Sequence, residues 1–302
     1  MQTMLDTIAA HARSSAADGK VASYIPALAA VDPRKFALVV RTAEGQEFAT
    51  GDADTAFSIQ SMSKLFALAL AMEWVGEGLW DKVGREPSGM RFNSLIQLET
   101  EDGRPRNPFI NAGAIATTDA LMSVRPYYVQ DLLSQFRQLS GNPSITVNDE
   151  VHRSEMATGD LNRAMAYVLK AHGNLANDPI DVTNAYFGAC AIEASARDLA
   201  RAAMFLVTPQ ENPAACARGL HAQRIRAIMR TCGMYDQSGE FAYRVGLPGK
   251  SGVGGGILVV QPGQFAACVW SPPLDRFGNS LAGQVALEAL AREVCWAGSA
   301  PV

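Results

Sequence analysis

The pattern of apolar and polar residues predicts a helix at the start of the chain, followed by a β-hairpin. The first 20 residues have the spacing of an amphipathic helix. Strands are predicted at Phe36 to Arg41 and at Glu47 to Thr50, with a turn at Glu44-Gly45 between them. The sheet of this protein therefore begins near the amino terminus.

From Ser61 to about Arg230 the apolar residues recur mostly at helical spacing. Pro, Gly and Asn clusters divide this region into helices near 61–76, 112–124, 127–140, 160–172, 183–193, 195–207 and 221–231. Strand patterns then return at Ala242 to Val245, Gly256 to Val260 and Phe265 to Trp270. A last helix is predicted from about 280 to 297.

Strands at both ends of the chain predict an α+β fold. We expect one antiparallel sheet built from the two ends, flanked by the terminal helices, with the helical region inserted between its strands. This gives a discontinuous sheet-containing part, residues 1–60 and 231–302, and a helical part, residues 61–230. The active site is expected at the junction of the two parts.

Composition and charge narrow the possible partners. With 48% hydrophobic residues the chain can bury a large core, and its net charge of -4 argues against nucleic acid or anionic lipid as a partner. The first 20 residues lack the features of a signal peptide, and the apolar run Leu65 to Met72 is far shorter than the roughly 20 residues of a membrane span. We expect a cytoplasmic protein.

The cysteines and histidines do not suggest a metal site. The cysteines are odd in number, widely spaced and without a Cys-x-x-Cys pair, so they are interpreted as small buried residues: Cys190, Cys216, Cys232, Cys268 and Cys295. The four histidines never lie three or four residues apart, which removes the usual helical spacing of metal ligands. No metal and no cofactor is predicted.

Ser61 and Lys64 lie three residues apart at the start of a very apolar helix, so they share one helix face. A serine becomes a nucleophile when a base takes its proton, and a lysine can do so only when it is neutral. Burial and the positive end of the helix dipole both disfavour the ammonium form. The alternative is a serine-rich helix cap followed by an exposed lysine.

A second motif, Lys250-Ser251-Gly252-Val253, precedes the glycines and the apolar run of a strand. This order resembles the Lys-Ser/Thr-Gly strand that accompanies Ser-x-x-Lys in active-site-serine β-lactamases and penicillin-binding proteins. In that arrangement the N–H of Val253 can donate to an oxyanion. A phosphate-binding P-loop is rejected, because Arg244 stands where its first glycine is required and a strand follows instead of a helix.

Longer strings resemble the glutaminase family, whose members have a β-lactamase-like fold. The matching strings run from residue 23 to Val253 and are Ser23-Tyr-Ile-Pro-Ala-Leu-Ala29, Gln60-Ser-Met-Ser-Lys64, Asn107-Pro-Phe-Ile-Asn-Ala-Gly-Ala-Ile115, Gly233-Met-Tyr-Asp236 and Val245-Gly-Leu-Pro-Gly-Lys-Ser-Gly-Val253. The resemblance implies hydrolysis of L-glutamine to L-glutamate and ammonia, without a cofactor, by a homo-oligomer (a dimer or tetramer). It therefore turns the general serine-lysine motif into a specific hypothesis.

The resemblance also implies roles for individual residues. Ser61 is the nucleophile and Lys64 its proton acceptor, with Tyr24 and Tyr235 beside them and Lys250 in support. A tyrosine hydroxyl near a neutral lysine can pass a proton to the departing ammonia. Taken singly, each tyrosine is equally explained as a half-buried aromatic residue with a satisfied hydroxyl.

The substrate contacts implied by the resemblance, besides Ser61 and Tyr235, are Asn111, Glu155, Asn162, Tyr186 and Val253. Glutamine is a zwitterion, so Glu155 is the natural partner of its ammonium group, and the amides and the Tyr186 hydroxyl can donate to its carboxylate. Without the resemblance, Asn111 would be interpreted as a helix cap and Glu155 as a solvated charge. The sequence departs from the family at Leu161, where a basic residue is common.

Two other functions remain open. A β-lactamase or D-alanyl peptidase would use the same serine and lysine, but such enzymes act outside the cytoplasmic membrane and carry a signal peptide. An amino-acid sensor would keep the pocket without turnover. The presence of Ser61, Lys64, Tyr235 and Lys250 together favours an active enzyme.

Overall fold

The protein is built around a five-stranded antiparallel sheet that joins the two ends of the chain. The computed structural model describes residues 1–209 and 219–296. Strand order is β2-β1-β8-β7-β6, and the strands are β1 Ala37–Thr42, β2 Glu47–Gly51, β6 Gly249–Ser251, β7 Gly256–Gln261 and β8 Phe265–Trp270. The predicted sheet made from both ends is confirmed, because β1 pairs directly with β8.

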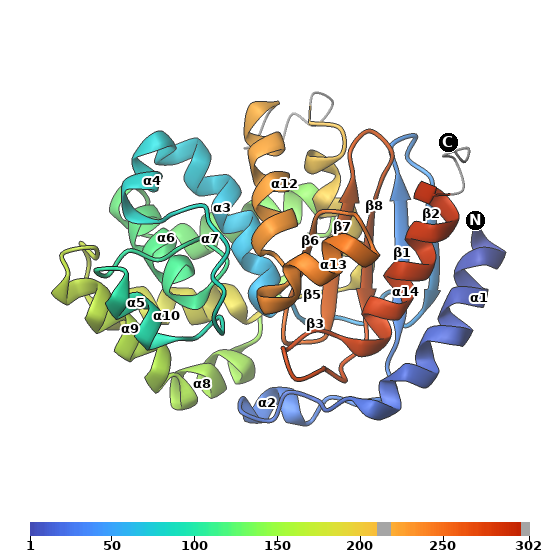
Figure 1. Ribbon diagram of the computed structural model, residues 1–302, viewed down its shortest axis with the longest axis horizontal. Helices are drawn as coiled ribbons and strands as arrows, with labels where there is room; N and C mark the ends of the chain where they lie inside the picture. The colour runs from blue at the N-terminus through green and yellow to red at the C-terminus, as the bar shows by residue number, and fades with distance from the viewer. Residues whose placement is uncertain (210–218, 297–302) are drawn as a thin grey trace.

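Both faces of the sheet are covered, which explains why β1 is apolar at consecutive positions. Leu38 and Val40 pack against the terminal helices α1 (Gln2–Ala12) and α14 (Leu281–Ala291), which lie side by side on one face (Figure 1). Ala37 and Val39 point to the opposite face, in a cluster that contains most of the helix α3 (Ser63–Trp74). The flanking terminal helices were predicted, and the structure has them.

The helices between α2 and α13 form the left and central part of Figure 1. The α-helices are α2 Pro26–Ala29, α4 Leu79–Lys82, α5 Leu95–Thr100, α6 Asn111–Val124, α7 Tyr128–Ser140, α8 Asp149–Thr158, α9 Asp160–Ala171, α10 Pro179–Cys190, α11 Ala196–Ala202, α12 Leu220–Cys232 and α13 Ser238–Arg244. The short helices are η1 Arg13–Asp18, η2 Gln60–Met62, η3 Gly76–Gly78, η4 Ala203–Leu206, η5 Tyr235–Gln237 and the π-helix Arg292–Trp296.

The α3 helix runs through the centre of the molecule. Every residue from Ser63 to Met72 is buried, as expected of a helix that is apolar on all sides. None of the helices in the described ranges is long and apolar enough to cross a membrane. Because helix α3 is central and buried, it supports the residues at its amino-terminal end.

One predicted element was wrong, and the bounds of another were shifted. Ala242 to Val245 is not a strand: it belongs largely to helix α13, in which Phe241 and Val245, four residues apart, both enter the cluster beneath the sheet. The helix predicted at 183–193 begins earlier, at Pro179, because Asp178 caps it, and it ends at Cys190. Residues 192–194 instead form a strand.

That strand belongs to a small second sheet. Its order is β3-β5-β4, with β3 Phe57–Ser58, β4 Thr146–Val147 and β5 Ile192–Ala194. The cysteine interpretation holds where the structure shows the side chains: Cys190, Cys232 and Cys268 are free and buried. Cys216, the Cys295 side chain and the predicted end of the last helix at residue 297 lie outside the described residues.

Candidate active site

The turn that carries Ser61 connects strand β3 to helix α3. The Ile59 N–H donates to the Ile192 carbonyl at 2.9 Å, and Gln60 then adopts a φ of 49°, which is unusual for a residue other than glycine. The Gln60 side chain donates to the Ser58 hydroxyl at 2.9 Å and so fixes this conformation. A strained turn held by its neighbours positions Ser61 at the head of the buried helix.

The backbone of Gly252 lies against this turn. A Cβ atom at Gly252 would lie 2.6 Å from the Ile59 carbonyl oxygen and 3.3 Å from the Ser61 nitrogen, so only glycine fits. The Gly252 N–H donates to the Gly256 carbonyl at 2.9 Å, which holds the turn between β6 and β7 in place. The Lys-Ser-Gly motif is thereby brought beside Ser61, as its resemblance to serine hydrolases predicts.

Lys64 is a buried amine, only 3% exposed, which rules out the alternative of an exposed lysine after a helix cap. Its Nζ donates to the Asn111 Oδ1 at 2.6 Å and to the Phe109 carbonyl at 3.3 Å. Burial lowers the pKa of Lys64 to about 8, while the nearby Glu155 opposes this effect. A substantial fraction of Lys64 is therefore neutral near pH 8 and able to accept a proton.

Asn111 connects Lys64 to the wall of the site. Its Nδ2 donates to the Asn162 Oδ1 at 2.9 Å, and its Oδ1 also accepts from the Tyr186 hydroxyl at 3.3 Å. The side chain makes no capping hydrogen bond to helix α6. The helix-cap interpretation of Asn111 was therefore wrong, and its amide belongs to the site.

Tyr235 approaches Ser61 from the other side. It has a φ of 54°, and its hydroxyl interacts with the Ser61 side chain and donates to the Ser251 carbonyl at 3.4 Å. Burial raises the pKa of Tyr235 to about 12, so the hydroxyl keeps its proton at neutral pH. The Phe92 ring packs on it, with ring centres 4.6 Å apart.

A cavity of about 100 Å³ opens in front of these groups. Seven residues predicted from the sequence line it, namely Tyr24, Ser61, Asn111, Glu155, Asn162, Tyr186 and Val253. Gln60, Phe92, Asn93, Thr158 and Leu161 line it as well and were not predicted as site residues, although Gln60 stands inside a string that matched the family. Lys64, Tyr235 and Lys250 lie behind this surface.

Glu155 is the only carboxylate among the residues that line this cavity. It is 6% exposed, which excludes the alternative of a solvated charge. Burial raises its pKa to about 7, against the opposing effects of a hydrogen bond from Gln60 and the charge of Lys64. An incoming cation would restore the charged form of this carboxyl group, so the wall is suited to an ammonium group.

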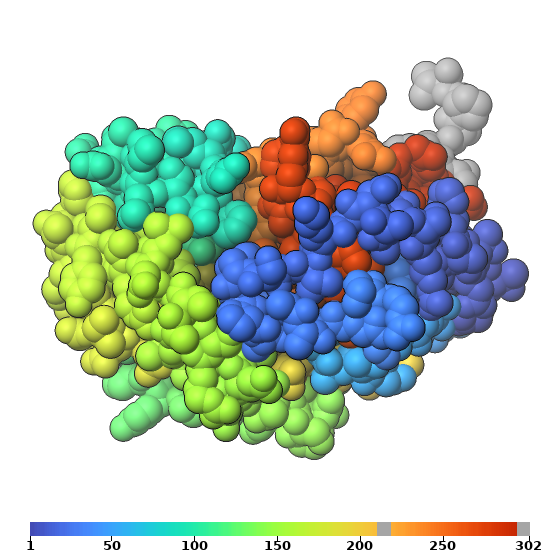
Figure 2. Space-filling model, turned by 90° about the horizontal axis from the view of Figure 1, so that it is seen from below, coloured from blue at the N-terminus to red at the C-terminus, as the bar shows by residue number. Residues whose placement is uncertain are grey.

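The amino-terminal segment closes the rim of the cavity. Tyr24 is 57% exposed there, just before α2, and the Ala27 N–H donates to the Ser154 hydroxyl at 3.2 Å. Figure 2 shows this blue segment lying against the yellow-green region that contains helix α8. Residues more than a hundred positions apart thus form one wall.

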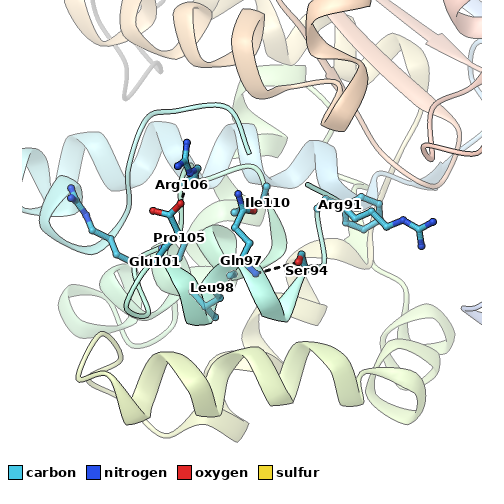
Figure 3. Close-up of a pocket in the computed structure, with 11 residues that line it drawn as sticks. Arg91, Ser94, Gln97, Leu98, Glu101, Pro105, Arg106 and Ile110 are labelled. Atoms are coloured by element: carbon cyan, nitrogen blue, oxygen red, sulfur yellow. Dashed lines mark hydrogen bonds and ion pairs between the residues drawn. The ribbon is translucent and has the colours of Figure 1, made fainter. Parts of the chain in front are cut away.

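A smaller hollow of about 10 Å³ lies beside helix α5. Figure 3 shows Arg106 and Glu101 paired across it, with 2.7 Å between the Arg106 Nε and the Glu101 Oε1. The Ser94 side chain accepts from the Gln97 N–H at 3.3 Å. These polar groups pair with one another, whereas the groups at Ser61 face an open cavity.

The protein has a β-lactamase-like fold. Its defining features are the antiparallel sheet, the inserted helices and the buried pair Ser61 and Lys64. A family model described as glutaminase matches residues 19–297. The thermolabile glutaminase of Rhizobium etli is 52% identical, over 98% of this chain and 97% of its own, and the glutaminase of Pseudoalteromonas atlantica is 49% identical over 98% of both. The chain belongs to the glutaminase family.

Solved structures agree with this assignment. The probable glutaminase ybaS superposes with a TM-score of 0.88 at 38% identity and 97% coverage of both chains. A probable glutaminase from Bacillus subtilis, complexed with 6-diazo-5-oxo-L-norleucine, superposes with a TM-score of 0.86 at 31% identity, over 97% of this chain and 95% of that one. The predicted fold class and family are confirmed.

Proposed function

We propose that this protein hydrolyses L-glutamine to L-glutamate and ammonia, with Ser61 as the nucleophile and Lys64 as its base. The observation that carries the proposal is a cavity bounded by Ser61 and by the buried carboxyl group of Glu155. A free amino acid carries an ammonium group that matches this carboxylate. Its side-chain amide can then reach the serine.

The chemistry takes place in two stages. The Ser61 Oγ attacks the amide carbon while Lys64 takes the hydroxyl proton, and the C–N bond breaks as the nitrogen receives a proton and leaves as ammonia. Water then attacks the glutamyl ester, one of its protons passes to the Ser61 Oγ as the ester C–O bond breaks, and glutamate is released. In this structure the Lys64 amine donates to Asn111. The hydrogen bond between Lys64 and the Ser61 hydroxyl that this step requires is expected to tighten when substrate is bound.

Tyr235 is the proposed proton donor to the leaving ammonia, and the proton that Lys64 took from Ser61 replaces the one that Tyr235 gives up. Its hydroxyl interacts with Ser61, and its raised pKa keeps the proton available. The Ser61 and Val253 amides are the proposed oxyanion donors, because the Gly252 backbone is packed against the Ser61 nitrogen. Asn111, Asn162 and Tyr186 are the proposed neutral partners of the substrate carboxylate.

The test is ammonia release from L-glutamine by the purified protein without added metal or nucleotide. Ser61→Ala should abolish release, whereas Ser63→Ala, a change at a serine two residues away that is also buried, should retain it. Asparagine, one methylene shorter, should react slowly because its carbonyl is misplaced. Release from a lactam but not from glutamine would support the β-lactamase alternative, and binding without release would support a sensor.

We also propose a cytoplasmic homo-oligomer. Free, buried cysteines in the described part of the chain are compatible with a reducing compartment. Val124, Tyr127 and Ile180 are exposed apolar side chains of the helical region, available to a second copy. Sedimentation equilibrium tests the assembly, and a monomer at all concentrations would reject it. The discontinuous parts 1–60 with 231–302 and 61–230 remain our proposed division, with the site at their junction.

A further inference from the structure

Asn279, from the last part of the chain, holds the turn that carries Tyr235. This asparagine lies between strand β8 and helix α14 and is 0% exposed. Its Nδ2 donates to the Met234 carbonyl at 3.2 Å and to the Gln237 Oε1 at 2.6 Å. One buried amide therefore binds the turn on both sides of Tyr235.

The backbone of Tyr235 needs such support. Its φ is 54°, a region that a tyrosine occupies only when the surrounding structure imposes it. The Ser238 hydroxyl accepts from the Met234 N–H at 3.1 Å and donates to the Tyr235 carbonyl at 2.9 Å. These two bonds stabilise the turn locally, but they do not set its place relative to the sheet. Asn279 provides side-chain hydrogen bonds from outside the turn.

Asn279 is itself fixed by a tight loop that begins at Asp275. The Asp275 side chain accepts from the Asn279 N–H at 3.0 Å and from the Phe277 N–H at 2.8 Å. The Asp275 N–H in turn donates to the Asn279 carbonyl at 2.8 Å. At Gly278, where φ is 92°, a Cβ atom would lie 3.7 Å from the Tyr235 ring, so the loop backbone packs beside this ring. The asparagine thus has a fixed position from which to hold the turn.

We infer that Asn279 is a positioning residue of the proposed reaction: it holds the Tyr235 hydroxyl beside Ser61. The inference rests on the proposed function, because it concerns the proton that Tyr235 gives to the leaving ammonia. A proton donor acts only within hydrogen-bond reach of the leaving nitrogen, so a small shift of the turn slows this transfer. Asn279 does not line the cavity and acts through Tyr235 alone.

Only the donor side of the Asn279 amide is used. Its Oδ1 accepts no hydrogen bond from the residues that the structure describes, whereas its Nδ2 donates twice to one turn. An aspartate at this position would keep the shape of the side chain but place a carboxyl group against two acceptor oxygens. The structure therefore predicts that shape alone does not preserve the turn.

The first experiment measures ammonia release from L-glutamine in a single turnover at pH 8, with enzyme in excess, so that the rate reports acylation alone. Asn279→Asp should lower this rate about 100-fold through misplacement of Tyr235. Substrate affinity should be nearly unchanged, because the Glu155 wall belongs to helix α8. Ser280→Ala is the matched control, since Ser280 is also 0% exposed and its hydroxyl caps helix α14 at the Gly283 N–H. This change weakens the same junction without touching the turn, and it should keep the wild-type rate.

A second pair of variants leaves Asn279 in place. Gln237 is half-buried, so its replacement tests the contact without disturbing a fully buried residue. Gln237→Met removes the acceptor and should lower the rate about 10-fold, whereas Gln237→Glu keeps an acceptor oxygen and should stay within about threefold of wild type. Equal rates in these two variants would overturn the inference.

The leaving group distinguishes positioning from general damage. Ammonia must receive a proton as it departs, whereas a thiolate, whose acid has a pKa near that of cysteine, leaves without one. With the γ-thiomethyl ester of L-glutamate, Asn279→Asp and Tyr235→Phe should each release methanethiol within about fivefold of the wild-type rate. A thioester rate that falls as far as the glutamine rate would mean a distorted Ser61 site and would contradict positioning through Tyr235.

The double variant tests whether both residues act on one step. If Asn279 acts through the Tyr235 hydroxyl, Asn279→Asp/Tyr235→Phe should release ammonia no more than about twofold more slowly than Tyr235→Phe. A further loss as large as that seen in wild type would overturn the inference. Wild type that hydrolyses glutamine while Asn279→Asp is unimpaired would reject the inference alone, whereas inactive wild type would reject the proposed function. Thermal unfolding shows which variants are folded, and the Gln237 pair decides the matter if Asn279→Asp is not.

Discussion

The buried carboxyl group of Glu155 leads to a prediction that links function to stability. Its pKa is raised from 4.5 to about 7, mainly by burial. A pKa change of one corresponds to a free-energy difference of about 1.36 kcal/mol between the two protonation states. In the protein without substrate, the ionised form of Glu155 therefore costs roughly 3 kcal/mol of folding free energy.

The sign of the pH dependence follows from the two pKa values. Below pH 4.5 the carboxyl group is protonated in the folded and unfolded chain, so the cost is absent. As the pH rises from 4.5 to 7 the unfolded chain loses its proton first, and the free energy of unfolding falls. Above pH 7 the full cost is present.

Glutamine at position 155 has nearly the same shape and no charge. At pH 8 and without substrate, Glu155→Gln should be more stable than wild type by up to about 3 kcal/mol, or roughly 5 °C in Tm, and at pH 5 most of this difference should vanish. The same variant should lose at least about 100-fold in kcat/KM for L-glutamine, because the substrate ammonium loses its buried partner.

The assay is thermal unfolding of both proteins at pH 5 and pH 8, with steady-state kinetics at pH 8. Comparing variant with wild type at each pH cancels the titration of all other groups. A variant that is less stable than wild type at pH 8 would refute the reasoning, because it would mean that the Glu155 carboxylate stabilises the protein even without substrate.

Three further predictions concern other parts of the site and its support. Because the pKa of Lys64 is about 8 and the neutral amine is the active form, kcat should rise with pH through about 8 and then level; a flat profile from pH 6 to 9 would argue against Lys64 as the base. Gly252→Ala should lower kcat at least about 100-fold, because its Cβ would lie 2.6 Å from the Ile59 carbonyl and displace the Ser61 turn; near-normal rates would show that the turn adapts. Asp119→Ala should lower the free energy of unfolding by about 3 kcal/mol, because the buried carboxylate accepts the N–H groups of residues 176 and 177. A folded Asp119→Ala variant with a much lower kcat would contradict a purely structural role.

The large sheet and the central helix could be predicted because their patterns are simple. Strands β1, β7 and β8 are short apolar runs bounded by glycine and polar turns, and α3 is an uninterrupted apolar segment after Ser61. The prediction failed at residues 242–245, because four residues are too few to distinguish the apolar spacing of a helix from that of a strand. There, the packing of Phe241 and Val245 beneath the sheet determines the helix.

The candidate site was predicted through longer strings, since its single residues are ambiguous. Asn111 lies at the start of a helix, where asparagine commonly serves as a cap. In the structure its side chain instead accepts a hydrogen bond from Lys64. The strained backbone of Gln60 and Tyr235 carries no local sequence signal at all. Tertiary contacts impose these conformations, and no window of neighbouring residues contains that information.

Several unfavourable features of this protein lie together at the candidate site. Burial disfavours the charged forms of both Lys64 and Glu155. The backbone at Gln60 and Tyr235 is strained. A core selected for stability alone would replace all four with apolar or relaxed residues. An ammonium group entering the cavity at pH 8 would pair with the ionised Glu155 carboxylate and recover part of the cost of burying it. Substrate should therefore stabilise the protein more at pH 8 than at pH 5, where the carboxyl group is already neutral.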